Sequence, residues 1–318
     1  MSIPSSNPIT RREACGLFCG ASAALAFPLL NADDPPAPFH FNYVLASAMY
    51  GTFTLDLILP ELQKTGTAKI DLWRKPHGDQ REQADAMGLA KLQELLHSHH
   101  AEVGMLTCYS SGPFKLQDDI AFAAKLGAKT IVTGSDKEAN EPTGPAARDA
   151  VAKFLEKMKP HAEAAEKAGV RIAVENHSSQ MLFSPDSIRY FAELNKSPHL
   201  GIAFAPHHLV AHAEEIPQLI GDVGPNLAFF YAQEHGKGFL QKLPKNEEMM
   251  QMPGFGGGLD YKPVAAALRK INYQGFVEIL MHPTPRGIPI LPTIDEVTAA
   301  INKSRNYLDE CLRDSARH

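Results

Sequence analysis

From residue 41 onwards, short apolar runs alternate with amphipathic stretches of helical length. The apolar runs predict eight strands, at 41–48, 68–73, 101–109, 128–135, 171–177, 200–206, 227–236 and 275–283. Apolar residues that recur every three or four positions predict the intervening and final helices, at 55–66, 81–100, 116–127, 144–169, 184–195, 213–224, 261–272 and 294–312. Pro160 predicts a kink or a break in the helix at 144–169.

The predicted strands are continuously apolar, which is typical of a parallel sheet with both faces buried. Eight successive strand–helix units predict a single (β/α)8 TIM barrel, an α/β fold. A doubly wound open sheet is the alternative, but no glycine-rich phosphate loop follows the first strand. The stretch GFGGGLD at 254–260 follows no strand directly, so it predicts a tight turn or flexible loop rather than a dinucleotide site.

The first 32 residues differ in character from the rest. Arg11 and Arg12 precede an uncharged run, roughly 14–30, that ends before an acidic pair. This pattern predicts a twin-arginine export signal at 1–32, a mature barrel at 33–318 and a periplasmic or otherwise exported protein. An uncleaved membrane anchor is the alternative, although the run is short for a bilayer span and contains glycine and proline. We expect no stable membrane insertion once the signal is removed.

Composition narrows the choice of partners. The chain has 318 residues, of which 44% are hydrophobic and 21% charged, and its net charge is −5. These values are ordinary for a globular protein and give no basic face for a nucleic acid. Only two of the four cysteines, Cys108 and Cys311, lie beyond the predicted signal. They could pair after export, but two cysteines predict no disulfide framework.

Chemistry in TIM barrels lies at the carboxyl ends of the strands, so the residues found there are read together. Glu175 and Glu278 stand out because each is a carboxylate in a strand that otherwise reads as core. A buried carboxylate usually has a cation, a partner or a proton, and a structural salt bridge is the plainer alternative. Two carboxylates with nearby imidazoles suit one divalent ion, Mn²⁺, Mg²⁺, Co²⁺ or Zn²⁺. Such an ion would stabilise an enediolate while a glutamate moves the proton.

Three segments together resemble the xylose-isomerase-like barrels, a superfamily of sugar isomerases and epimerases that also includes AP endonuclease IV. The segments are AEKAGVRIAVENH, LGIAFAPHHL and GFGGGLDYKPVAAALRKINYQGFVEI, and the resemblance covers about residues 40–310. The stretches KPHGDQREQ, GPFKLQDD and HPTPRGIPILP are similar to exported bacterial proteins described only as sugar phosphate isomerase/epimerase. The resemblance implies a fold and a site rather than one particular reaction.

The resemblance also implies a metal site. Epimerases of the family hold one metal with a glutamate on strand five, an aspartate on strand six, a histidine on strand seven and a glutamate on strand eight. Glu175 and Glu278 match the two glutamates, which act as acid and base on opposite faces of the substrate. Ala205 stands where the family has its aspartate, and Tyr231 or Gln233 at the strand-seven histidine. The predicted ligands are therefore those two glutamates with His208 and His235, in an altered or weaker site.

Other strand-end residues are predicted to contact a sugar substrate through hydroxyls, ring stacking or anionic groups. They are Trp73, His77, His177, His207, Gln233 and Arg286. Each has a plainer alternative as a core or loop residue. The histidines at 97, 99 and 100 lie at the opposite end of the barrel and predict a solvated helix end.

Four functions remain open from the sequence. The first is a metal-dependent isomerase or epimerase of a ketose or keto-sugar. The second is a lyase that eliminates the aglycone of a 3-keto-glycoside after the same proton abstraction. A three-zinc phosphodiesterase fits less well, because it needs more ligands than these strand ends supply. The fourth is a non-catalytic sugar-binding barrel, favoured by Ala205. Barrels of this family often pair, so a homo-oligomer is a further expectation.

Overall fold

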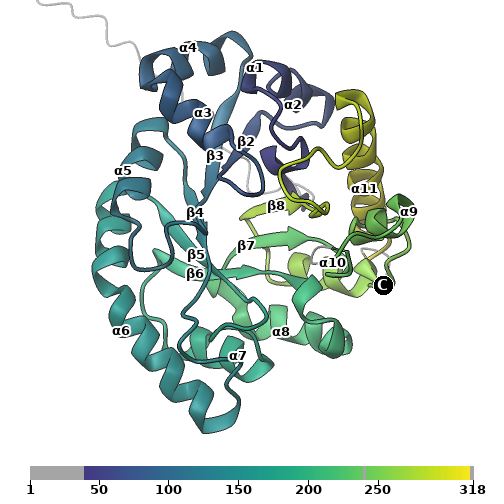
Figure 1. The fold of residues 1–318 in the computed structure, drawn as a ribbon. Helices are drawn as coiled ribbons and strands as arrows, with labels where there is room; N and C mark the ends of the chain where they lie inside the picture. Colours follow the sequence, from purple (N-terminus) through teal and green to yellow (C-terminus); the bar gives the residue numbers. More distant parts are fainter. Residues whose placement is uncertain (1–38, 239–240, 316–318) are drawn as a thin grey trace, which may run out of the picture. The chain divides into compact units, whose positions relative to one another are not determined.

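Eight parallel strands close into a barrel in the computed structural model, which describes residues 39–238 and 241–315 (Figure 1). The strands pair in sequence order, and β8 pairs again with β1. They are β1 (Asn42–Ala46), β2 (Lys69–Trp73), β3 (Glu102–Thr107), β4 (Thr130–Thr133), β5 (Arg171–Glu175), β6 (Leu200–Phe204), β7 (Leu227–Ala232) and β8 (Phe276–Ile279). The predicted (β/α)8 barrel is thereby confirmed. The predicted export signal at 1–32 lies outside the described residues.

Helices surround the barrel and cover the outer face of the sheet (Figure 1). They are α1 (Leu55–Ile58), α2 (Glu61–Lys64), α3 (Gln80–Met87), α4 (Leu89–Ser98), α5 (Gln117–Leu126), α6 (Gly144–Ala168), α7 (Pro185–Leu194), α8 (Ile216–Val223), α9 (Lys245–Glu248), α10 (Tyr261–Lys270) and α11 (Ile294–Asp314). Short 3-10 turns include η1 (Ser47–Met49), η2 (Pro206–His208), η3 (Val210–Glu215), η4 (Gly224–Asn226) and η5 (Met249–Gln251). Two of these turns, η1 and η2, follow the carboxyl ends of β1 and β6.

Two predicted helices are divided in the structure. The helix predicted at 81–100 ends before Gly88 and starts again after it, because Gly88 has φ +83° and ψ 154°. The helix predicted at 55–66 is split into α1 and α2 at Leu59 and Pro60. By contrast, α6 runs from Gly144 to Ala168 through Pro160 as one helix, so the predicted break is absent.

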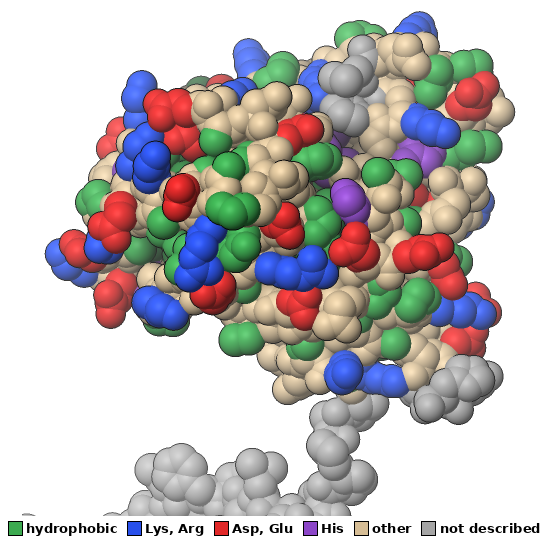
Figure 2. Space-filling model, turned by 90° about the horizontal axis from the view of Figure 1, so that it is seen from below, with side chains coloured by type: hydrophobic (Ala, Val, Ile, Leu, Met, Phe, Trp, Pro, Cys, Tyr) green, Lys and Arg blue, Asp and Glu red, His purple; other side chains and the backbone are tan. Residues whose placement is uncertain are grey.

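The distribution of charged side chains on the surface agrees with the composition, which gave no sign of a basic face. On the face drawn in Figure 2, lysine and arginine side chains are interspersed with aspartate and glutamate rather than gathered by sign. No helix in the part of the chain that the structure describes combines the length and apolar character of a membrane span. Cys108 and Cys311 are both buried and free, so the pairing left open by the sequence is not formed.

Candidate active site

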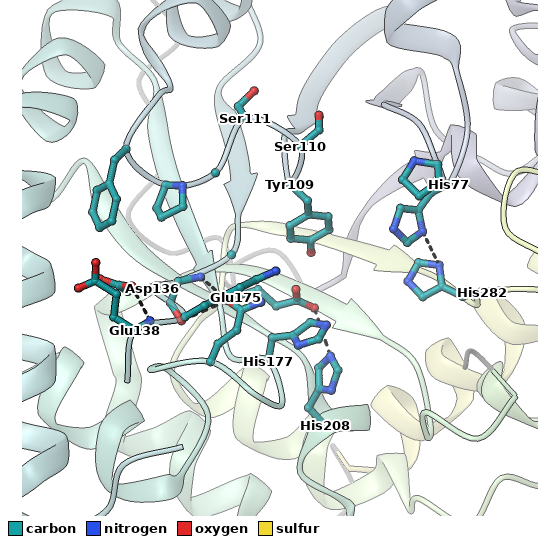
Figure 3. A pocket seen from close by; sticks show the side chains of 18 of the residues that line it. His77, Tyr109, Ser110, Ser111, Asp136, Glu138, Glu175, His177, His208 and His282 are labelled. Carbon is teal, nitrogen blue, oxygen red and sulfur yellow. Dashed lines mark hydrogen bonds and ion pairs between the residues drawn. The ribbon is translucent and has the colours of Figure 1, made fainter. Parts of the chain in front are cut away.

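A pocket of about 560 Å³ opens where the carboxyl ends of the strands meet their loops. Its wall comes from the loops that follow β2, β3, β4, β5, β6 and β8 (Figure 3). Six of the residues predicted from sequence line it: His77, Glu175, His177, His207, His208 and Arg286. Because this end of a TIM barrel carries the chemistry in characterised enzymes, the pocket is the candidate active site.

Glu175 is the last residue of β5, and only 4% of it is exposed. Burial raises the pKa of its carboxyl group, and interactions with His177, Tyr109 and Arg286 partly offset that rise. Its Oε2 atom has no hydrogen-bond partner among the described residues. A buried carboxylate with a free oxygen and a raised pKa is well suited to accept a proton from a bound molecule.

His207 and His208 lie beside Glu175, in the turn η2 that follows β6. His208 Nε2 lies 3.7 Å from Glu175 Oε1, and the His208 ring is 4.0 Å, centre to centre, from the rings of both His177 and His207. Burial lowers the pKa of His207 to about 3 and that of His208 well below its usual value. Both imidazoles are therefore neutral at neutral pH.

A second pair of histidines forms another part of the wall, away from Glu175 (Figure 3). His77 Nδ1 lies 3.2 Å from His282 Nδ1, and Nη1 of Arg286 lies 2.8 Å from both ring nitrogens of His77. Burial and the charge of Arg286 lower the pKa of His77 to about 3. His282 was not among the site residues predicted from the sequence.

Two tyrosines connect the pocket with the barrel interior. The hydroxyls of Tyr109 and Tyr231 are 2.9 Å apart, and Tyr109 lines the pocket. Burial raises the pKa of Tyr231, and both Glu175 and Glu278 raise it further. Tyr231 therefore lies within electrostatic reach of both glutamates. Neither tyrosine was assigned a site role from sequence, although Tyr231 was a candidate for the position of the family histidine.

Glu278 lies inside the barrel and does not line the pocket. Its neighbour there is Asp71 of β2, a residue that the sequence analysis passed over. Both residues are fully buried, and Thr107 Oγ1 donates a 2.5 Å hydrogen bond to Asp71 Oδ2. Burial raises the pKa of Asp71 to about 7, and it raises that of Glu278 well above its usual value with a further contribution from Asp71.

The remaining predicted residues are buried outside this pocket. Trp73 packs its ring against those of His77 and His282. Gln233 Nε2 donates to Gln251 Oε1 at 2.9 Å, while His235 Nδ1 accepts the backbone N–H of Lys237 at 3.1 Å. The side chains of Gln233 and His235 are thus held by neighbouring loops, and Trp73 supports the histidine pair from behind.

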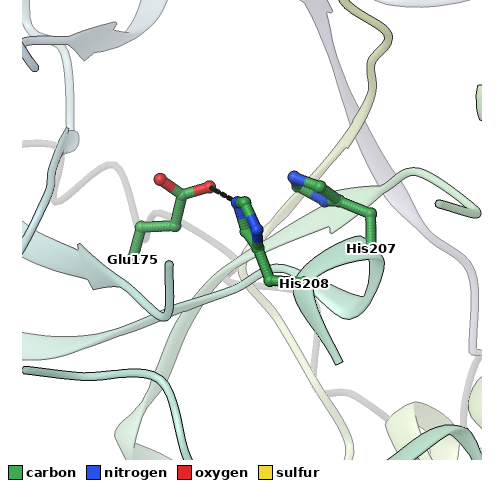
Figure 4. A group of neighbouring side chains, drawn as sticks. All are labelled: Glu175, His207 and His208. Carbon is green, nitrogen blue, oxygen red and sulfur yellow. Dashed lines mark ion pairs between the residues drawn. The ribbon is translucent and has the colours of Figure 1, made fainter. Parts of the chain in front are cut away.

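The four-ligand metal arrangement expected from the family is not reproduced. Ala205 has no ligand atom in its side chain, and Tyr231 or Gln233 stands at the strand-seven position; Tyr231 pairs in register with Glu278. Glu278 itself has Asp71 as its neighbour. The described residues that could hold an ion together are Glu175, His207 and His208, whose ligand atoms all lie within 4.8 Å of one another (Figure 4). His235 and Glu278 are not part of this group.

The sequence matches the family model for the xylose isomerase-like TIM barrel over residues 59–310, so the chain belongs to that family. Similar solved structures include an L-ribulose 3-epimerase, with a TM-score of 0.64 and 14% identity over 87% of this chain and 96% of that one. The IOLI protein with a bound zinc atom has a TM-score of 0.64 and 16% identity over 86% and 99% of the two chains. A D-allulose 3-epimerase from Methylomonas sp. in complex with D-allulose has a TM-score of 0.62 and 14% identity over 86% and 98%.

A comparison of the sequence with curated proteins gives no match. At identities of 14–16%, the likeness to the solved structures establishes the fold. A shared fold does not determine the reaction, which depends on the residues of this chain's own site.

Proposed function

We propose that the protein is an isomerase or epimerase of a ketose or keto-sugar. It moves a proton at the carbon next to the carbonyl group, through an enediolate. The observation that carries the proposal is Glu175, a buried carboxylate with an unpaired oxygen on the wall of the pocket. Sugar epimerases among the similar structures support it.

In this proposal Glu175 is the general base. A base is most effective when its pKa lies near the working pH, and burial moves the pKa of Glu175 upward in that direction. The rings of His207 and His208 are neutral and add no positive charge beside the carboxylate, so the effect of Arg286 only partly offsets the rise in its pKa. It therefore stays basic enough to take a carbon-bound proton.

The enediolate needs stabilisation of its negative oxygens. Arg286 supplies positive charge to the pocket, and the neutral pair of His77 and His282 has one ring N–H left to donate, since the other N–H joins the two rings. Preorganised donors of this kind stabilise charge that develops in the transition state. A divalent ion, when bound, would polarise the carbonyl and the neighbouring hydroxyl in the same sense.

Return of the proton decides between isomerisation and epimerisation. Transfer on one face of the enediolate needs only Glu175. Transfer to the opposite face needs a second acid, the role we predict for Glu278. Since Glu278 does not line the pocket, we infer that its proton would travel through the hydroxyls of Tyr231 and Tyr109, a route that requires Glu278 to form a hydrogen bond absent from the described structure.

The test is turnover of a panel of ketoses and keto-sugars by the full chain and by two carboxylate variants. Glu175→Gln should lower the rate about 10²–10⁴-fold, the usual contribution of a general base. Glu138→Gln is the matched control, since Glu138 lines the same pocket but is paired with Lys157. Equal rates for Glu175→Gln and the wild type would refute the assignment. A sugar that binds without any turnover would favour the non-catalytic alternative.

A lyase acting on 3-keto-glycosides is a second candidate, favoured by the length of the pocket. Beyond the histidines it continues along Ser110–Phe114 and Asp136–Glu138. A cavity of about 560 Å³ lies in the range that holds drug-sized ligands, so a substituent on the sugar ring has room there. Release of a free aglycone from a 3-keto-glycoside would identify this reaction, and formation of an isomer with no aglycone would identify the first.

We further propose that residues 1–32 direct export and that the enzyme works outside the cytoplasm. Mass spectrometry of the N-terminus of protein recovered from the periplasm tests this, because an intact Met1 would contradict cleavage. Assembly into a homo-oligomer remains a prediction.

A further inference from the structure

We propose that this barrel binds one divalent transition-metal ion through Glu175, His207 and His208, at the ends of β5 and β6, with Glu278 and His235 outside the ligand set. The site differs from the four-ligand site that the family resemblance implies. It does not depend on the proposed function, because a metal can bind whichever sugar reaction the pocket performs.

The distances allow one ion to reach all three side chains. Zinc lies about 2.0–2.2 Å from histidine nitrogens and carboxylate oxygens, so two of its ligand atoms lie at most about 4.4 Å apart, and about 3.3–3.6 Å apart in a tetrahedral site. His208 Nε2 and Glu175 Oε1 already meet this condition at 3.7 Å. The widest separation in the group is no more than 4.8 Å, so a contraction of at most about 1.5 Å brings the ligand atoms to tetrahedral spacing.

Two buried atoms of the group have no partner in the described structure. They are Nδ1 of His207 and Oε2 of Glu175. A buried polar atom left without a hydrogen bond destabilises the folded state, so few are expected without a reason. A cation bound by both residues would interact favourably with the carboxylate of Glu175 and with the lone pair of the imidazole. The imidazole must be neutral to bind a metal, and it is.

The backbone that carries the ligands is held in place. The side chain of Asn176, next to Glu175, accepts the N–H of Ala205 at 2.7 Å and donates to its carbonyl oxygen at 3.0 Å. This pair of hydrogen bonds fixes the end of β6 against the end of β5, and Pro206 then starts the turn that presents the histidines. The alanine that replaces a family ligand thus serves as the anchor for two new ones.

The composition of the site indicates which ion it prefers. Two imidazoles and one carboxylate suit Zn²⁺ or Co²⁺ better than Mg²⁺, which favours oxygen ligands. All three side chains line the pocket, so a remaining coordination position faces the space for substrate. Three protein ligands and one open position are typical of catalytic rather than structural zinc.

The experiment is a titration of the full chain, stripped with a chelator, with Zn²⁺ and separately with Co²⁺. Calorimetry gives the affinity, and the visible absorption of cobalt reports its ligands. His207→Ala, His208→Ala and Glu175→Gln should each weaken binding about 100-fold or more, since loss of mere outer-shell partners already costs about 10–100-fold. His77→Ala is the matched control, a pocket histidine outside the group, and should change the affinity less than about threefold.

Glu278→Gln and His235→Ala decide between this site and the one expected from the family. We expect both to bind metal like the wild type. A loss in either as large as that in His207→Ala would overturn the proposal, and so would the absence of binding in a wild type shown to be folded by circular dichroism. Turnover measured in the presence of chelator keeps the questions separate: activity without metal would leave the proposed function standing while this site fails.

Discussion

Asp71 and Glu278 place two carboxyl groups within the barrel, and neither forms a salt bridge in the described part of the chain. Burial disfavours both charges, and each carboxylate would also repel the other. We expect at least one of them to keep its proton at neutral pH. A buried pair of this kind lowers the stability of the folded state, and proteins commonly retain such destabilising pairs near functional sites.

Asp71→Asn should therefore stabilise the protein at high pH. The pKa of Asp71 rises from 3.8 to about 7 on folding, so between these values the folded state holds a proton that the unfolded state has lost. Unfolding then releases a proton, and the free energy of unfolding falls as pH rises through this window. The variant avoids the loss and keeps an acceptor for Thr107. We expect a gain of about 1–4 kcal/mol at pH 8, since a tenfold change in proton affinity is worth about 1.4 kcal/mol.

Urea unfolding at pH 4 and pH 8 measures this effect. The gain should be much smaller at pH 4, which is close to the ordinary pKa of 3.8, because the folded carboxyl is protonated there and the unfolded one is only partly ionised. Asp118→Asn, at an exposed aspartate of α5, is the control and should change little at either pH. A variant less stable than the wild type at pH 8 would mean that the Asp71 carboxylate is stabilising.

Three residues show which parts of the site could be predicted from the sequence and which could not. Glu175 was predicted because a carboxylate at the end of an apolar strand is a strong signal. Asp71 carries the same signal, in KIDLW, but its importance depends on the pairing with Glu278, which only the barrel brings about. His235 lies two residues from Gln233 at the end of strand seven, and no sequence pattern showed that its own loop would take up its Nδ1.

Among the elements, the glycine-rich loop at 254–258 has a clear structural role. Gly254 N–H donates to Glu234 Oε1 at 2.7 Å. The backbone N–H groups of Gly257, Gly258 and Leu259 also favour the charged carboxylate, against the burial that raises its pKa. The loop thus wraps a carboxylate of the chain itself, with Gly254, Gly256 and Gly258 at positive φ, as expected of the tight turn predicted from the sequence.

Gly257→Ala should destabilise the fold. A Cβ atom at this position would lie 2.1 Å from the carbonyl oxygen of Met250 and 2.5 Å from Glu234 Oε2, so the loop has to move. Overpacking of this kind typically costs about 1–3 kcal/mol. Thermal unfolding measures it against Gly221→Ala in α8, where a Cβ meets nothing within 4 Å and alanine should be neutral or stabilising. Equal midpoints for the two variants would contradict this description of the loop.

The elements also show where sequence patterns reach their limit. All eight strands were predicted, because strands that are buried on both faces of a parallel sheet are continuously apolar. The division of the helix at Gly88 was missed, since apolar spacing continues across it and only the φ of +83° reveals the break. Pro160 misled in the opposite direction, because packing of the long helix α6 outweighs the one hydrogen bond that proline removes.

At the scale of the whole molecule, closure of the barrel makes the site. His77 and His282 are 205 positions apart in the sequence, yet their ring nitrogens lie 3.2 Å apart because β8 returns to pair with β1 and β2 follows it. The alternation of strands and helices predicted this closure, and with it the end of the barrel where polar residues gather. Register and loop conformation decide which of these residues meet. They place Glu175 beside His207 and His208 rather than beside Glu278.

The proposed function rests on proton transfer by Glu175 at a carbon next to a carbonyl. The most direct measurement is the deuterium content of substrate and product when the wild-type chain turns over a keto-sugar in D2O, followed by NMR. We predict deuterium at the carbon that loses its proton, in the product and in recovered substrate, and none with Glu175→Gln. Product formed at the full rate by Glu175→Gln, whatever its deuterium content, would contradict the role assigned to Glu175.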